Sequence, residues 1–208
     1  MRTSCSQRRL AVFELNFKRI SVAFDFSFFA AVALLTLFSG NYALLGLAAC
    51  IWHELGHLIF MKICGIPVKR MVFYGAGIKI VPDKLIDFTG FGTSFLILLG
   101  GSSANFMLAA ALWLINFPAA RLFAAINALI GTFNLLPLQY LDGGKIILLF
   151  IRRLCSYSAA CLLERFFKWC SVFLIMTVLI VFAFLGKGNI TLYVTLCYLL
   201  VTSICVDT

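Results

Sequence analysis

Charged residues are scarce in this chain: only 12% of its 208 residues are Asp, Glu, Lys or Arg, whereas 63% are hydrophobic. A soluble domain of this length has about a quarter charged and about half apolar residues. The shortage excludes an ordinary soluble enzyme and predicts an integral membrane protein, with lipid as its main solvent. We expect residues 1–208 to form one transmembrane domain, because the length leaves no room for a second, soluble domain.

Paired cysteines and spare histidines are missing as well. The eight cysteines contain no C-x-x-C pair and are scattered through apolar stretches. A disulfide framework is therefore disfavoured, and the cysteines are better explained as small buried hydrophobic side chains in a reducing setting. The chain has only two histidines, so histidine-rich metal-binding loops are excluded.

Long apolar runs are abundant and predict an all-α polytopic membrane protein with about six transmembrane helices. Most of these runs approach the roughly 20 residues that a helix needs to cross the hydrocarbon core. The predicted spans are residues 21–39, 42–64, 94–117, 119–138, 169–186 and 190–206.

The basic residues predict the orientation of these spans. With the N-terminus inside, all 17 lysines and arginines except Arg121 and Lys187 fall on the cytoplasmic side, as the positive-inside rule requires. Both termini are then cytoplasmic, and residues 1–20 form a cytoplasmic N-terminal segment. The net charge of +9 is thereby explained by orientation and by contact with anionic lipid head groups of the bilayer, so we expect no nucleic-acid partner.

Two stretches are too polar to span the membrane. Residues 65–93 predict a small β-hairpin or interfacial insertion between the second and third helices, because β-branched and aromatic residues flank a Gly-Ala-Gly turn at 75–77. Residues 154–168 mix Leu, Phe and Cys with charged residues. That mixture predicts an amphipathic segment lying in the membrane interface.

The two histidines stand four residues apart in the apolar run "CIWHELGHLIF". His53 and His57 therefore share one helix face and can direct their imidazoles at one ion. Glu54, roughly 100° around the helix, can reach a water on that ion without being a ligand. This is the H-E-x-x-H arrangement of two metal ligands and a general base. Ionisable groups in mid-membrane are costly and usually functional, which favours a metal site over purely structural histidines.

A catalytic metal site of this kind needs a third protein ligand. No histidine remains, a cysteine stays possible, and Asp25 is a competitor because it lies inside the first predicted span. Asp142 is the best candidate. It ends the stretch "NLLPLQYLD", in which Pro137 breaks an apolar run and Gly143-Gly144 follows. Broken helices at membrane depth occur where they are buried in protein or line a cavity, as at a site.

"HELGH" on a predicted span, followed by "NLLPLQYLDGG", resembles the site-2 protease family of intramembrane zinc metalloproteases. The likeness covers residues 20–150 and is greatest to the stage IV sporulation protein FB branch. It implies a bacterial cytoplasmic (inner) membrane protein with one Zn²⁺ per chain. The implied roles are zinc ligation by His53, His57 and Asp142, general base catalysis by Glu54, and contact with the scissile peptide or its oxyanion by Asn134.

The likeness extends to the third span, where "GGSSANF" matches a small-residue segment of the family. Asn105 takes the place of the family's asparagine there and is a candidate substrate-binding residue. Gly101 is followed by Ser102 where the family usually has proline, and the second proline that many members have in the aspartate loop is missing. We therefore expect these departures to affect the loop geometry but not the ligand set.

The implied reaction is cleavage of a membrane-associated or transmembrane protein by zinc-activated water. A helical substrate must unwind before its carbonyls can be attacked, and an exposed hairpin edge could hold it extended. Ile78 and Ile80 are therefore candidate substrate-binding positions. The branch suggests a membrane-tethered pro-protein as substrate, such as a pro-sigma factor or an anti-sigma-like regulator. A homo-oligomer and an inhibitory membrane partner both stay open.

Two other classes of function fit part of the pattern. A polytopic metal transporter or sensor would explain His53, His57 and Asp142, but transporters usually carry further metal sites. A catalytically silent scaffold would explain the fold, but it has no use for Glu54 beside the metal. We therefore predict a protease.

Overall fold

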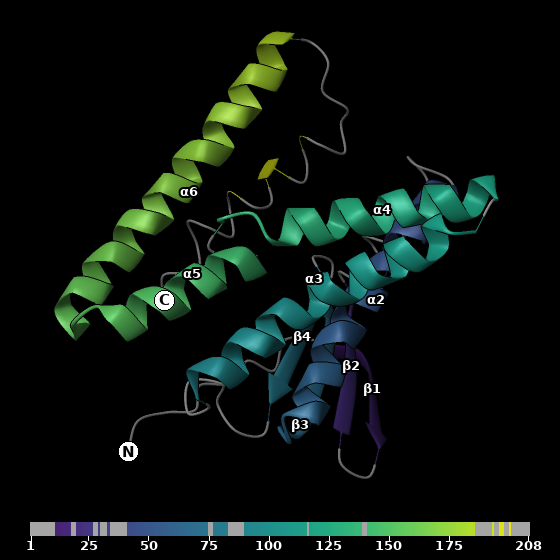
Figure 1. Cartoon of the computed structure of the whole chain (residues 1–208), viewed down its shortest axis with the longest axis horizontal. Helices are drawn as coiled ribbons and strands as arrows, with labels where there is room; N and C mark the ends of the chain where they lie inside the picture. Colours follow the sequence, from purple (N-terminus) through teal and green to yellow (C-terminus); the bar gives the residue numbers. More distant parts are fainter. Residues whose placement is uncertain are drawn as a thin grey trace. The chain divides into compact units, whose positions relative to one another are not determined.

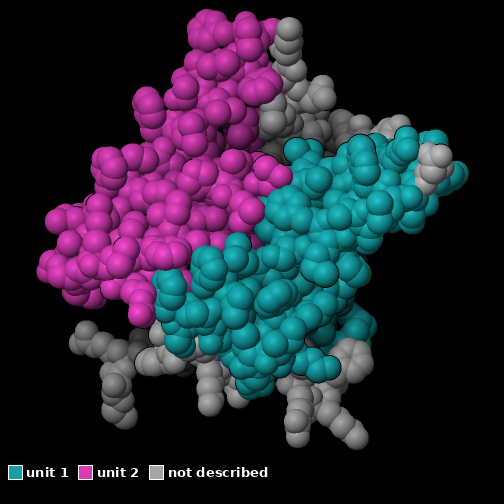
Figure 2. All heavy atoms as spheres, viewed as in Figure 1, with its two compact units in different colours: residues 1–131 teal, residues 132–208 magenta. Residues whose placement is uncertain are grey.

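The computed structural model describes residues 11–17, 20–26, 29, 33, 41–74, 77–82, 90–115, 117–138, 141–185, 193, 196, 197 and 200 (Figure 1). Most of these residues are helical, and a small sheet accompanies the helices. The chain divides into two compact units, residues 1–131 and residues 132–208 (Figure 2).

The first unit contains a four-stranded sheet in the order β1-β2-β3-β4. β3 and β4 are antiparallel and β2 and β3 are parallel. The predicted hairpin is thus confirmed, but it is half of a larger sheet, and β4 is the edge strand among the strands that the structure describes. The strands are β1 (Ala11–Phe17), β2 (Ile20–Asp25), β3 (Val68–Tyr74) and β4 (Gly77–Pro82).

The prediction of a first transmembrane helix over residues 21–39 is wrong at its N-terminal end, because β2 occupies Ile20–Asp25. The sequence ISVAFD alternates large apolar residues with Ser, Ala and Asp, which is the period of a strand. Phe24 stacks on Phe73 of the neighbouring strand, with ring centroids 4.6 Å apart. β1 comes from the predicted N-terminal segment and pairs with β2. Most of residues 26–40 lie outside the described residues.

Three helices complete the first unit or cross its boundary: α2 (Asn41–Ile63), α3 (Phe91–Trp113) and α4 (Pro118–Asn134). They match the predicted spans 42–64, 94–117 and 119–138 closely. Met61 near the end of α2, Ile66 just after it and Ile97 of α3 form a buried apolar cluster that joins the end of α2 to α3.

Small residues let α2 and α3 approach closely. A Cβ placed on Gly56 would collide with the carbonyl oxygen of Gly100 and lie 2.7 Å from Cβ of Ala104. Such backbone proximity is typical of small-residue helix contacts in membranes, where van der Waals packing replaces the hydrophobic effect. The indole Nε1 of Trp52 donates a hydrogen bond of 2.9 Å to the Ala104 carbonyl and fixes the same contact.

The second unit contains α5 (Asp142–Leu154) and α6 (Tyr157–Leu185). The segment 154–168, predicted as a separate interfacial segment, is divided between two helices: Leu154 ends α5, and the residues from Tyr157 onward continue directly into the predicted span 169–186 as the single 29-residue helix α6. Arg152 of α5 pairs with Glu164 of α6 at 2.6 Å. The predicted span 190–206 falls mostly outside the described residues, although Leu196 packs with Leu138 and Ile175.

Three helices in the described part of the chain are long and apolar enough to cross a membrane, namely Leu44–Ile63, Phe91–Trp113 and Tyr157–Leu185. At most 28% of any of their most apolar windows is buried within the protein. Large apolar side chains are correspondingly exposed, such as Met107 on α3 and Phe184 on α6. These helices indicate an integral membrane protein whose surface is solvated by lipid; the predicted number of six spans is not reached among them.

Candidate metal centre

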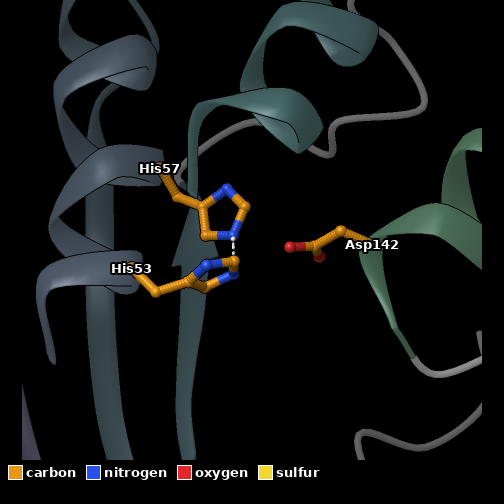
Figure 3. A group of neighbouring side chains, drawn as sticks. All are labelled: His53, His57 and Asp142. Carbon is orange, nitrogen blue, oxygen red and sulfur yellow. Dashed lines mark hydrogen bonds between the residues drawn. The ribbon is translucent and has the colours of Figure 1, made fainter. Parts of the chain in front are cut away.

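The H-E-x-x-H pattern brings the two histidine rings together on α2 (Figure 3). His53 and His57 are 4% and 9% exposed, and their Nε2 atoms lie 3.2 Å apart. The ring planes are nearly perpendicular, at 84°. Two nitrogen ligands on a tetrahedral ion, each at about 2.0–2.1 Å, are separated by about 3.3 Å. The imidazole pair therefore already has the spacing of two ligands on one metal ion.

α3 orients both rings from their far sides. His57 Nδ1–H donates a hydrogen bond of 2.7 Å to the carbonyl of Ile97, which leaves the lone pair of the ring on Nε2. Metal-ligating histidines typically make such a bond with their second nitrogen, because it fixes the tautomer and the ring direction. The side-chain amide of Asn105 lies 3.4 Å from His53 Nδ1.

Gly101 provides the space that the two rings occupy. A Cβ at this position would lie 2.5 Å from His57 Nε2 and 2.6 Å from His53 Nε2. Such distances are well inside van der Waals contact, so any larger residue would displace the nitrogens that face each other. The stripe of small residues on α3 thus serves the histidine pair as well as the helix contact.

Asp142 is the first residue of α5 and is 4% exposed. A carboxylate is favoured at this end of a helix by the partial positive charge of the unpaired amides. Lys145, one turn later, donates to Asp142 Oδ1 at 3.1 Å. Ligation of a metal through the other oxygen is compatible with this ion pair, because a carboxylate accepts through both oxygens.

The chain breaks between α4 and α5, as Pro137 predicted. α4 ends at Asn134, and the Leu138 amide closes a turn onto the Leu136 carbonyl at 2.8 Å. Gly143 lies so close to the backbone of Leu135 that a Cβ there would collide with the Leu135 carbonyl. The glycine after the aspartate is therefore required for α5 to begin where it does.

Ligand atoms of His53, His57 and Asp142 all lie within 4.8 Å of one another, and all three residues are buried (Figure 3). They form the one such group of three or more His, Cys, Asp or Glu residues within the described ranges. The three residues could therefore hold a metal ion. Neither Asp25, which ends β2, nor a described cysteine joins them.

The residues predicted to act in catalysis or substrate binding lie on α2, α3, α4 and β4. Glu54 lies between the two histidines on α2, half-buried. Asn134 is the last residue of α4 and is also half-buried. Ile78 and Ile80 lie on the edge strand β4, opposite Phe73 and Met71 of β3. Asn105, predicted to bind substrate, lies with its amide beside the His53 ring.

Two features of the centre were not predicted from the sequence: the Ile97 carbonyl that orients His57 and the contact of Asn105 with His53. The "GGSSANF" motif carried a signal for the second, since Gly101 and Asn105 are one helical turn apart and share a face. A backbone carbonyl leaves no comparable trace in the sequence.

Comparison with known proteins supports the fold. No protein-family model matches the chain, and no curated protein sequence matches it. Among solved structures, a site-2 protease from Methanocaldococcus jannaschii is similar with a TM-score of 0.68 and 19% sequence identity, over 92% of this chain and 93% of that chain. The chain therefore has the fold of that site-2 protease, at a low sequence identity.

Proposed function

We propose that the chain is an intramembrane zinc metalloprotease, in which His53, His57 and Asp142 hold the ion and Glu54 is the general base. The observation that carries this proposal is the group of three buried ligands with the two Nε2 atoms 3.2 Å apart. Two imidazoles and one carboxylate are a common ligand set of catalytic zinc sites, which keep the fourth position open for water or substrate. The shared fold with a site-2 protease supports the same reading.

A zinc ion bound there supplies a Lewis acid that acidifies water and polarises the scissile carbonyl. Glu54, the residue directly after His53, accepts the proton of the attacking water and passes it to the departing amine. The Asn134 side chain donates a hydrogen bond to the oxygen that becomes negative in the transition state. Lys145 holds the carboxylate of Asp142 in a fixed orientation.

The substrate in this proposal is a membrane-tethered protein, such as a pro-protein or regulator, cut within a cytoplasmic membrane. We also propose that the chain is most like the stage IV sporulation protein FB branch of the family. Both of its termini lie on the cytoplasmic side of the membrane in this proposal. Such a substrate is mostly helical, and a helix hides its carbonyls in backbone hydrogen bonds. The protein must therefore offer these backbone groups another partner.

Metal removal tests the proposed reaction. We expect membranes containing the chain to generate new protein N-termini, to stop doing so after treatment with a zinc chelator, and to resume when Zn²⁺ is restored. Magnesium, which prefers oxygen ligands and octahedral geometry, should not restore cleavage. Mass spectrometry of protein N-termini is the measurement. Cleavage that persists in fully metal-free membranes would contradict the proposal.

The edge strand β4 is the proposed holder of the extended substrate. It is last in the sheet order, so its outer backbone groups face away from β3 and can pair with an incoming strand. Ile80→Pro removes one backbone N–H from this strand. If that N–H faces the substrate, losing a hydrogen bond of about 0.5–1.5 kcal/mol should slow turnover by roughly 2- to 12-fold.

Neighbouring N–H groups of a strand point alternately to opposite edges, so Ile78→Pro should act like Ile80→Pro. Ile80→Val keeps the N–H and is the matched control, with native turnover expected. Zinc content should stay native in all three variants. Full turnover in both proline variants, with zinc bound, would show that β4 does not hold the substrate.

A further inference from the structure

Asn105 makes a polar contact with Nδ1 of the His53 ring, whereas His57 contacts Nε2 of that ring. It is 0% exposed and comes from α3, whereas His53 comes from α2. In the orientation of this structure its Nδ2 faces His53 Nδ1 at 3.4 Å. Its Oδ1 is buried and has no hydrogen-bond partner within the part of the chain that the structure describes. A buried amide oxygen left in this way is costly and calls for a physical explanation.

The orientation of the amide decides which nitrogen of His53 carries the proton. When Nδ2 faces the ring, it donates to Nδ1, so the ring proton sits on Nε2 and is donated to His57 Nε2, 3.2 Å away. When the amide turns by half a rotation, Oδ1 faces the ring and accepts a hydrogen bond from Nδ1–H. The lone pair of His53 is then on Nε2, beside that of His57.

Only the second arrangement presents two lone pairs to one metal ion. His57 is already in the required tautomer, because its Nδ1–H donates to the Ile97 carbonyl. The oxygen and nitrogen of an asparagine amide are assigned from the hydrogen-bond network and have almost the same shape, so the site accommodates both orientations. Asn105 can thus do for His53 what the Ile97 carbonyl does for His57.

We infer that Asn105 is a positioning residue whose Oδ1 accepts the Nδ1–H of His53 and so directs His53 Nε2 to the metal ion. This inference rests on the proposed metal centre and assigns Asn105 to the ligand rather than to the substrate. The step is balanced within the ring: the Nε2–H bond of His53 breaks and an Nδ1–H bond forms, so the ring loses one proton and gains one, while the Asn105 amide rotates. His53 Nε2 would then offer its lone pair to a metal ion held by His53, His57 and Asp142.

The native chain provides the first test, because its two histidines are the only ones in the sequence. Nuclear magnetic resonance of protein labelled with ¹⁵N-histidine then shows just the two rings. On addition of Zn²⁺ we expect the His53 signal to become that of a ring protonated at Nδ1 and metallated at Nε2. A His53 ring that binds zinc through Nδ1 would overturn the inference while leaving the metal centre intact.

Substitutions provide the second test, with zinc affinity as the readout. Asn105→Leu keeps the bulk but removes the acceptor, and we expect zinc to bind about 10- to 100-fold more weakly, the usual effect of losing such a partner. Asn105→Asp restores an acceptor oxygen and should bind zinc nearly as tightly as the native chain. Rescue by Asp distinguishes a hydrogen-bonding role from simple packing.

Asn127 of α4 is the matched control. It is also 0% exposed, its Oδ1 is likewise without a partner among the described residues, and its Nδ2 donates to the Phe123 carbonyl. Asn127→Leu should leave zinc affinity and both histidine signals unchanged. Native zinc affinity in Asn105→Leu would refute the positioning role. A native chain that binds no zinc at all would instead refute the proposed function.

Discussion

Replacing Glu54 with glutamine is expected to slow peptide cleavage by about 10²- to 10⁴-fold, the usual contribution of a general acid–base group. Glutamine has nearly the same shape, but its amide cannot accept the proton of the attacking water. Glu54 lies between the two histidines on α2 and is not one of the three grouped residues that could hold the metal. Bound zinc should therefore be unchanged. Product N-termini and zinc content, measured on the same preparation, test both halves of this prediction.

The result of Glu54→Gln also separates the three classes of function. A scaffold would keep its partner binding and a transporter its metal flux, because neither needs a base beside the ion. Glu14→Gln is a suitable control, since Glu14 pairs with Arg70 at 3.6 Å in the sheet and is 42% exposed. Native cleavage by Glu54→Gln would reject the proton transfer proposed for this residue.

The sequence was most informative where the membrane makes a residue costly. Polar groups in a long apolar run need a strong reason to be there, so His53, His57 and Asp142 could be predicted as a group. The long apolar runs placed α2 and α3 to within a few residues. The Gly-rich turn between two β-branched stretches placed β3 and β4 in the same way.

The sequence was least informative where two chain segments far apart must find each other. β2 was mistaken for the start of a membrane helix because six residues of alternating apolar character were merged into a longer apolar run. Its parallel pairing with β3 joins Val22 to Met71, a contact that no local pattern encodes. The contact between Asn105 and His53 is equally non-local, because the two residues are 52 positions apart in the sequence.

Removing the third ligand is expected to have the other large effect. Asp142→Ala leaves two imidazoles, and zinc affinity should fall by more than about 100-fold, because even the loss of a residue outside the ligand set costs 10- to 100-fold. Cleavage should fall with it. The substitution should be tolerated by the fold, because alanine has a high helix propensity. Zinc binding measured by competition with a chelating dye, together with product N-termini, tests the prediction.

Glu164→Gln is the matched control for this loss of a carboxylate. Glu164 lies in the same unit, is partly buried and pairs with a basic side chain as Asp142 does, but its partner is Arg152. Its loss should leave zinc bound and cleavage intact. If Asp142→Ala kept native zinc affinity instead, the third ligand would be another group, and Asp25 would be the first carboxylate to replace. A general effect of losing a negative charge or an ion pair would lower zinc affinity in both variants alike. The assignment of Asp142 as a ligand therefore requires that zinc affinity falls in Asp142→Ala and stays native in Glu164→Gln.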